Sequence, residues 1–166
     1  MKPLKIEKLD AAEFHPFGWF VEILKPEGEK IGKEPIEFFR DMMQQDLGGA
    51  AVVSYSICRV CARPPVVDVS EYHNGPAEMM LPLDRDVFIH VGPATPAGDP
   101  LPLKRFRAFK VPRGTMVVTR PGVWHHAPFT MDRKPASVLV ALPERTYAKD
   151  CHVVPLSPKQ RLRVSV

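Results

Sequence analysis

The sequence predicts a mainly β protein, built as a sandwich or barrel of short strands in one domain over residues 1–166. From residue 50 onward, short runs rich in β-branched and aromatic residues follow one another at close spacing, separated by turn residues. The chain also holds 19 prolines, which cannot donate to a sheet ladder or continue a helix, so they favour short strands joined by turns. With 166 residues, 45% of them hydrophobic, the chain is long enough to bury a substantial core.

The first fifty residues predict one or two short N-terminal helices. Asp10 followed by Glu13 resembles a capping box, and Pro16 would end that helix after about two turns. Residues 35–48 fit a second helix that starts on a proline and stops at a glycine. The position of Phe38 leaves a short strand as the alternative for the start of this segment.

Strand patterns dominate the rest of the chain. We expect strands over residues 50–62, 65–73, 77–83, 86–92, 106–112, 114–119, 124–129 and 136–143. Residues 92–103 are rich in proline and glycine and predict a surface loop. The basic tail, residues 157–166, is expected to be frayed.

Charge and cysteine content narrow the class of protein. The formal net charge is +4, with a sequence pI near 9.1, which suits a small anionic substrate. A basic cluster is interleaved with Phe106 and Phe109, but no nucleic-acid-binding motif accompanies it, so we interpret it as a solvated strand face; it contains Lys104, Arg105, Arg107, Lys110 and Arg113. No apolar run approaches membrane-spanning length and no signal peptide is recognisable. The three cysteines, Cys58, Cys61 and Cys151, predict reduced thiols in the cytoplasm.

Four residues in two regions have the chemistry of a metal site. Glu71 and His73 are two apart on an expected strand and therefore project from one face. Glu78 begins the next strand after an Asn-Gly turn, and His125 follows a Pro-Gly turn much later in the chain. A divalent metal requires three or four nitrogen or oxygen ligands that converge from rigid elements. These four residues are therefore candidate ligands.

His125 and His126 are adjacent, so they point to opposite faces if this segment is extended. At most one of them can face a given cavity. The other must face an interface, a hydrogen-bonding partner or solvent. We expect His15, His90 and His152, and the aromatic Trp124 and Phe129, to have structural roles.

The spacing of these residues resembles the two motifs of the cupins. Glu71-x-His73-x4-Glu78 resembles the first motif, with a glutamate in place of its first histidine. The run from Gly114 through Arg120 and Gly122 to His125 resembles the second motif. The resemblance implies a cupin-type double-stranded β-helix barrel with the ligands brought together inside it. It also selects His125 as the inward histidine, with His126 outward.

A narrower resemblance, to the ureidoglycolate lyase family, covers almost the whole chain. It rests on the segments LDAAEFHPFGWFVE, EYHNGPAEMMLPL, FRAFKVPRGTMVVTRPGVWHHAPF and DCHVVPL. Two differences from the family stand out. This chain has Glu78 where members commonly carry glutamine, and Thr119-Arg120 where they commonly carry a Tyr-His pair. The second difference replaces a tyrosine and a histidine beside the site, which removes a candidate proton-transfer group and bears on the substrate more than on the fold.

The resemblance implies a metal-dependent lyase of allantoin breakdown that cleaves ureidoglycolate to glyoxylate and urea. The metal would be nickel, zinc or manganese, held by Glu71, His73, Glu78 and His125. Glu78 and Arg120 are the candidate catalytic residues, and Arg107 and Arg120 are the candidate ligands of the substrate carboxylate. The resemblance further implies a homodimer. The alternatives are a different cupin enzyme acting on a small hydroxy or keto acid, and a non-catalytic cupin binding module.

Overall fold

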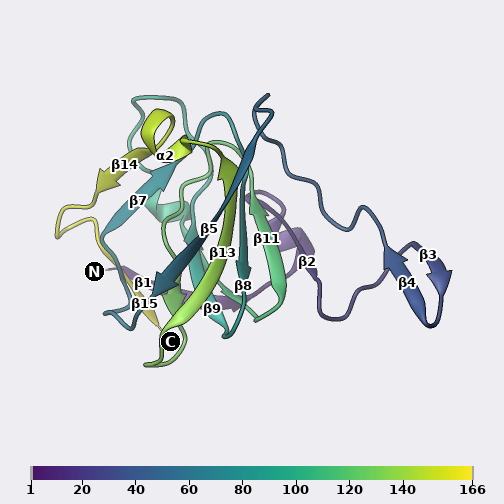
Figure 1. The fold of residues 1–166 in the computed structure, drawn as a ribbon. Coiled ribbons are helices and arrows are strands. Elements are labelled where there is room, and N and C mark those ends of the chain that lie inside the picture. The colour runs from purple at the N-terminus through teal and green to yellow at the C-terminus, as the bar shows by residue number, and fades with distance from the viewer. Residues whose placement is uncertain (1, 166) are drawn as a thin grey trace.

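The computed structural model describes residues 2–165 and shows curled sheets around a shared core (Figure 1). The larger sheet has the order β12-β9-β10-β1-β15-β6. Its strands are β1 (Lys2–Lys8), β6 (Val66–Val67), β9 (Val87–Val91), β10 (Arg107–Val111), β12 (Phe129–Thr130) and β15 (Leu162–Ser165). β1 pairs in parallel with both β10 and β15, and the other pairs of this sheet are antiparallel.

The second sheet is antiparallel and has the order β2-β11-β8-β13-β5. Its strands are β2 (Gly18–Glu22), β5 (Val53–Val60), β8 (Glu78–Pro82), β11 (Thr115–Thr119) and β13 (Ala136–Pro143). The remaining elements are the pair β7 (Val69–Tyr72) and β14 (His152–Pro155), the pair β3 (Lys30–Lys33) and β4 (Ile36–Phe39), and the helices α1 (Ala11–Phe14), η1 (Leu103–Arg105) and α2 (Thr146–Lys149). Within residues 2–165, no helix is long and apolar enough to cross a membrane.

Strand alternation separates the inside of the second sheet from its outside. On β8, Met80 belongs to the core cluster of Phe109 and Val117, whereas Met79 and Leu81 belong to a different cluster. Successive residues of a strand point to opposite faces. Glu78 has the same parity as Met80, so the first residue of β8 directs its side chain to the core side.

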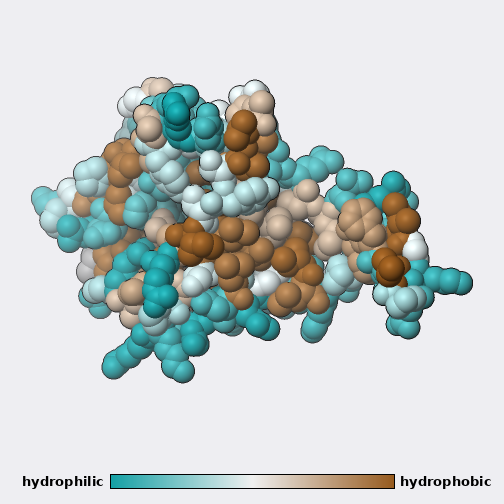
Figure 2. Space-filling model, viewed as in Figure 1, coloured by the Kyte–Doolittle hydropathy of each residue, from teal (hydrophilic) through white to brown (hydrophobic). Residues whose placement is uncertain are grey.

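The β3–β4 hairpin extends away from the body of the protein (Figure 1). Its apolar side chains Ile31, Ile36 and Phe38 are exposed. Figure 2 shows hydrophobic residues on this hairpin and again across the middle of the same face of the body. Exposed apolar residues gathered in this way are typical of surfaces that meet a partner.

The structure confirms the mainly β fold class. It also confirms the first helix, whose N-cap Asp10 accepts hydrogen bonds from the backbone of Ala12 and Glu13. That helix, α1, is only four residues long, shorter than the two turns expected. The strand expected over residues 124–129 is mostly replaced by isolated bridges at Trp124 and His125, and only Phe129 belongs to a named strand.

The second N-terminal helix prediction, over residues 35–48, is wrong. The segment starts with strand β4, which pairs with β3, and continues without regular structure to residue 47. Tertiary hydrogen bonds hold this irregular part. The Gln45 side chain donates to the carbonyls of Ala77 and Ala141, and the Trp19 indole donates to the carbonyl of Gln44. Such long-range partners override a local helical pattern.

The tail was also predicted incorrectly. Residues 162–165 form β15, which lies between β1 and β6 in the larger sheet, and residue 166 is outside the described residues. Leu162 and Val164 are buried, so this basic segment alternates apolar and polar residues as a half-buried strand does. Its partner β1 was not anticipated either. Parallel pairing of the two chain ends depends on long-range register that no local pattern reveals.

Candidate metal centre

Backbone pairing brings the two predicted motifs together. Glu71 and His125 form an antiparallel bridge in which each backbone N–H donates to the carbonyl of the other, at 2.6 and 2.8 Å. The N–H of Gly122 donates to the carbonyl of His73 at 2.6 Å. Gly122 has φ of +76°, a conformation that glycine adopts readily, so it can form the turn that leads into His125. Residues directly opposite in an antiparallel pair face the same side, which directs Glu71, His73 and His125 to one region.

His73, Glu78 and His125 form a buried triad. Glu78 Oε2 lies 3.0 Å from His73 Nε2 and 3.1 Å from His125 Nε2. The exposed fractions of the three residues are 2%, 5% and 2%. The ligand atoms of the triad all lie within 4.8 Å of one another. Metal–ligand bonds of about 2.1 Å at a right angle place two ligand atoms about 3 Å apart, so this spacing fits a divalent cation.

The hydrogen bonds of the two imidazoles favour a cation between their Nε2 atoms. His73 Nδ1 lies 2.6 Å from the carbonyl of Asp150, and His125 Nδ1 lies 2.8 Å from the carbonyl of Val123. A neutral imidazole has one N–H, and if Nδ1–H donates to the carbonyl, Nε2 presents a lone pair. Both lone pairs would then face the Glu78 carboxylate, which is unfavourable unless a positive charge lies between them. A metal ion supplies that charge and leaves both histidines neutral.

Without a metal ion, protonated imidazoles supply the positive charge beside Glu78. Burial alone raises the pKa of Glu78, but the charge and hydrogen bonds of His125 and His73 outweigh it and lower the pKa to about 2. Burial alone lowers the pKa of His125, but the Glu78 carboxylate outweighs it and raises the pKa above the ordinary histidine value. Glu78 is therefore ionised at neutral pH, which suits a metal ligand better than a proton shuttle.

Glu71 is close to the triad but has a different partner. Its exposed fraction is 9%, and Cys151 Sγ lies 3.5 Å from its Oε2 as a hydrogen-bond donor. Glu71, His73 and Cys151 form a second group whose ligand atoms lie within 4.8 Å of one another. The two groups share His73. The four predicted ligands are thus neighbours, but they divide between two overlapping sets.

The two predicted arginines contact residues other than those of the triad. The Arg107 guanidinium is ion-paired with the carboxylates of Glu7 and Glu13, and Glu7 raises the pKa of Arg107 above its already high value. The Arg120 guanidinium lies 4.8 Å from the ring of Trp19 and donates to the carbonyl of His15. Both arginines thus have partners within their own chain.

Register explains the position of Arg120. Thr119 pairs with Glu78 across β11 and β8 and shares its inward direction, so the next residue, Arg120, points to the outer face where Trp19 packs. The outward direction expected for His126 follows the same rule. Its neighbour His125 is buried, whereas His126 is partly exposed and its pKa is lowered, chiefly by burial.

Three residues at the C-terminal side of the site were not identified from the sequence. Asp150 accepts hydrogen bonds from the backbone of Asn74 and Gly75 and orients His73 through its own carbonyl. Cys151 contacts Glu71. Tyr147, from α2, lies edge-on to His73 with ring centroids 5.9 Å apart, although its own exposed fraction is 58%. The one signal for Asp150 and Cys151 was the stretch DCHVVPL, and Tyr147 had none.

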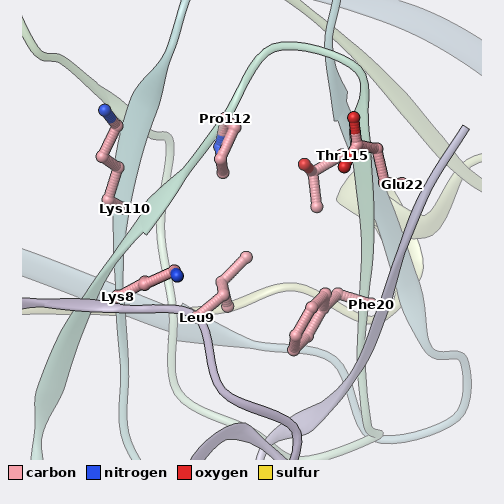
Figure 3. Close-up of a pocket in the computed structure, with 7 residues that line it drawn as sticks. All are labelled: Lys8, Leu9, Phe20, Glu22, Lys110, Pro112 and Thr115. Carbon is pink, nitrogen blue, oxygen red and sulfur yellow. The ribbon is translucent and has the colours of Figure 1, made fainter. Parts of the chain in front are cut away.

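Two cavities differ in their relation to the triad. Figure 3 shows a cavity of about 360 Å³ whose lining includes Lys8, Lys110 and Thr115. Thr115 begins β11, whereas Thr119, the partner of Glu78, ends it, which places this cavity about 13 Å along the strand from the triad. A second cavity, of about 540 Å³, has Cys151 in its lining and therefore adjoins the Glu71 side of the site.

The fold and this cluster define the class of protein: a mainly β protein with a buried histidine–carboxylate cluster that could hold a metal ion. Comparison with known proteins then identifies the family. A family model described as ureidoglycolate lyase matches residues 1–163, so the chain belongs to the ureidoglycolate lyase family. A ureidoglycolate lyase of Rhodobacter capsulatus is 31% identical over 127 residues, which cover 75% of this chain and 77% of that protein.

The chain is also similar to solved structures of Bacillus subtilis oxalate decarboxylase. One of these concerns its Mn(II) centers and another its substrate binding mode. Both are 16% identical and cover 63% of this chain, with a TM-score of 0.43. The matched part spans 24% of the length of those chains.

Proposed function

We propose that the protein cleaves ureidoglycolate to glyoxylate and urea, with a divalent cation held by His73, Glu78 and His125. Family membership supports the substrate. The observation that supports the cation is the placement of one Glu78 oxygen 3.0 and 3.1 Å from two imidazole nitrogens, each with its other nitrogen held by a carbonyl. A divalent cation bound there would act as a Lewis acid toward the hydroxyl and carboxylate oxygens of the substrate.

The residues of the chain divide the remaining work. The reaction must take the proton of the α-hydroxyl, break the bond from the carbinol carbon to a urea nitrogen, form the carbonyl of glyoxylate, and return a proton to the leaving nitrogen. Glu71 is the buried carboxylate that the histidines leave free, since its hydrogen bond comes from the Cys151 thiol. We assign the proton transfer to Glu71 instead of Glu78, whose low pKa makes it a weak base.

Asp150 and Tyr147 support this arrangement from the C-terminal side. The Asp150 carbonyl fixes the orientation of His73 and leaves Nε2 directed at Glu78. Tyr147 is only partly buried, but this partial burial raises its pKa, and the carboxylates of Glu78 and Glu71 raise it further. The Tyr147 phenol therefore stays protonated and can donate a hydrogen bond to a substrate oxygen.

The test is to load the purified protein with Mn²⁺ or Ni²⁺ and to measure urea and glyoxylate released from ureidoglycolate. We expect turnover that a chelator abolishes. Glu71→Gln should lower kcat by about 100- to 10,000-fold, as loss of a general base does, while the metal content stays at the wild-type level. The matched control is Glu22→Gln on β2. Glu22 pairs with Thr115, which lies at the end of β11 farther from the triad, so this amide substitution should leave kcat unchanged. Absence of turnover by the metal-loaded protein would favour a cupin enzyme with another acid substrate, or a binding module.

We also propose a single-domain, cytoplasmic homodimer. The three cysteines are free thiols, which suits a reducing compartment. The exposed apolar side chains of the β3–β4 hairpin, together with Tyr55 and Ile57 on the edge strand β5, support association with a second copy. Sedimentation equilibrium of the purified protein tests the dimer.

A further inference from the structure

A soft ligand lies beside the hard ligands of the triad. Cys151 Sγ, one oxygen of Glu71 and one nitrogen of His73 lie within 4.8 Å of one another, which is close enough for one ion to bind all three. Glu71 and His73 are buried and Cys151 is partly buried. Cys151 takes no part in the proposed reaction. Its sulfur gives this group a soft ligand that the triad lacks.

The Cys151 thiol has a hydrogen-bond partner in the same group of ligands. It donates its hydrogen to Glu71 Oε2, with 3.5 Å between the sulfur and the oxygen. A cation that binds here displaces this proton to solvent and receives two negative ligands, the thiolate and the carboxylate, together with one imidazole. Thiolate ligands favour soft ions such as Zn²⁺ over hard ions such as Mn²⁺.

A cavity lies beside one member of this group. Cys151 lines the 540 Å³ cavity together with His152 and Asp99. Asp99 is exposed, so its carboxylate adds negative charge at the cavity wall. The cysteine side of the group therefore adjoins a cavity whose charge favours cations.

We propose that Glu71, His73 and Cys151 form a second cation position, selective for thiophilic divalent ions, whose occupation excludes metal from the triad. The exclusion follows from His73. Its Nδ1 is held by the Asp150 carbonyl at 2.6 Å, so Nε2 is the single nitrogen with a lone pair, and it can bind one ion at a time. A thiophilic ion here also occupies Glu71. The expected effect is inhibition of the enzyme, a consequence that rests on the proposed function, whereas the cation position itself does not.

Cadmium binding provides a direct test, since thiolate-bound Cd²⁺ has a near-ultraviolet charge-transfer absorption. Cd²⁺ is titrated into the wild-type protein, Cys151→Ser and the control Cys61→Ser, which alters an exposed thiol. We expect one thiolate band per chain in the wild type and the control, and none in Cys151→Ser. The Cd²⁺ affinity of Cys151→Ser should fall by more than about 100-fold, beyond the effect of losing an outer-shell partner. Thermal unfolding of each metal-free variant checks that the fold is retained, and Glu71→Gln should weaken Cd²⁺ binding but keep the band.

Competition is measured on the Mn²⁺-loaded protein. Added Cd²⁺ should release one Mn²⁺ per chain, seen as the electron paramagnetic resonance signal of free Mn²⁺, and should do so at far higher concentration in Cys151→Ser. A wild-type protein without the band, or Cys151→Ser with an undiminished band, would overturn the second position. A band without Mn²⁺ release would overturn the exclusion. Mn²⁺-loaded protein that fails to turn over ureidoglycolate refutes the proposed function alone, because the cadmium band needs no turnover.

Discussion

Replacement of the two adjacent histidines separates the metal ligand from its neighbour. His125→Ala removes one of the three ligands of the triad, whose Nε2 lies 3.1 Å from Glu78 Oε2. Structural zinc sites bind their ion with about 10–16 kcal/mol, or roughly 3–5 kcal/mol per ligand if three ligands share it. A loss of 3 kcal/mol corresponds to a decrease in metal affinity of about 100-fold. His126→Ala alters a partly exposed ring that points the other way, so its metal affinity should equal that of the wild type.

The assay is equilibrium dialysis of both variants against Mn²⁺, followed by metal analysis. Unfolding curves of the metal-free proteins show whether each variant still folds. If His125→Ala retained the ion as tightly as His126→Ala, the argument from strand register would be refuted. The same holds if both variants lost the ion equally while remaining folded.

Three further predictions concern pH and the arginines. Metal affinity should fall as the pH is lowered, because protons compete with the metal for Nε2 of His125. The fall should begin above the ordinary histidine pKa, since Glu78 raises the pKa of His125. Titration calorimetry at several pH values measures this dependence. Arg107→Ala should destabilise the protein by about 1 kcal/mol at neutral pH. The stability difference between wild type and variant should disappear in acid. The hydrogen bond from Arg107 lowers the pKa of Glu7, so the stabilisation from this pair is lost as the pH falls through the lowered pKa. Urea unfolding of both proteins at pH 7 and pH 3 tests this prediction. Arg120→Ala should leave KM for ureidoglycolate close to the wild-type value, because the guanidinium packs on Trp19 at the outer face; a large rise in KM would restore it as the ligand of the substrate carboxylate.

The errors in the predicted fold lie in segments whose conformation is set by contacts with residues far away in the sequence. Residues 35–48 carry a helical pattern, yet Gln45 hydrogen-bonds to the carbonyls of Ala77 and Ala141, which no local window includes. The tail has a basic composition, yet Leu162 and Val164 are buried because β1 lies alongside them. In both segments the local preference is weak and the tertiary partners are numerous.

The candidate site divides in the same way. Glu71, His73, Glu78 and His125 could be named as candidate ligands from residue type and motif spacing, and the resemblance to the second motif selected His125 over His126. The position of Glu71 against a thiol could not be predicted, because Cys151 is 80 residues away in the chain. The partners of Arg107 and Arg120 could not be predicted for the same reason, since a guanidinium near a motif in sequence can lie on either face of the sheet.

The sequence by itself determined the mainly β class, the family and the residue types of the metal centre, because strand period, turn residues and motif spacing are properties of neighbouring residues. Only the tertiary structure decided which carboxylate lies between the two imidazoles and which lies against Cys151. It also decided that Asp150 orients His73. These outcomes depend on the register of β7 with β14 and of β8 with β11, and on the bridge from Glu71 to His125. Register between distant segments is fixed by packing of the whole barrel, and a shift of one residue would turn every one of these side chains to the other face.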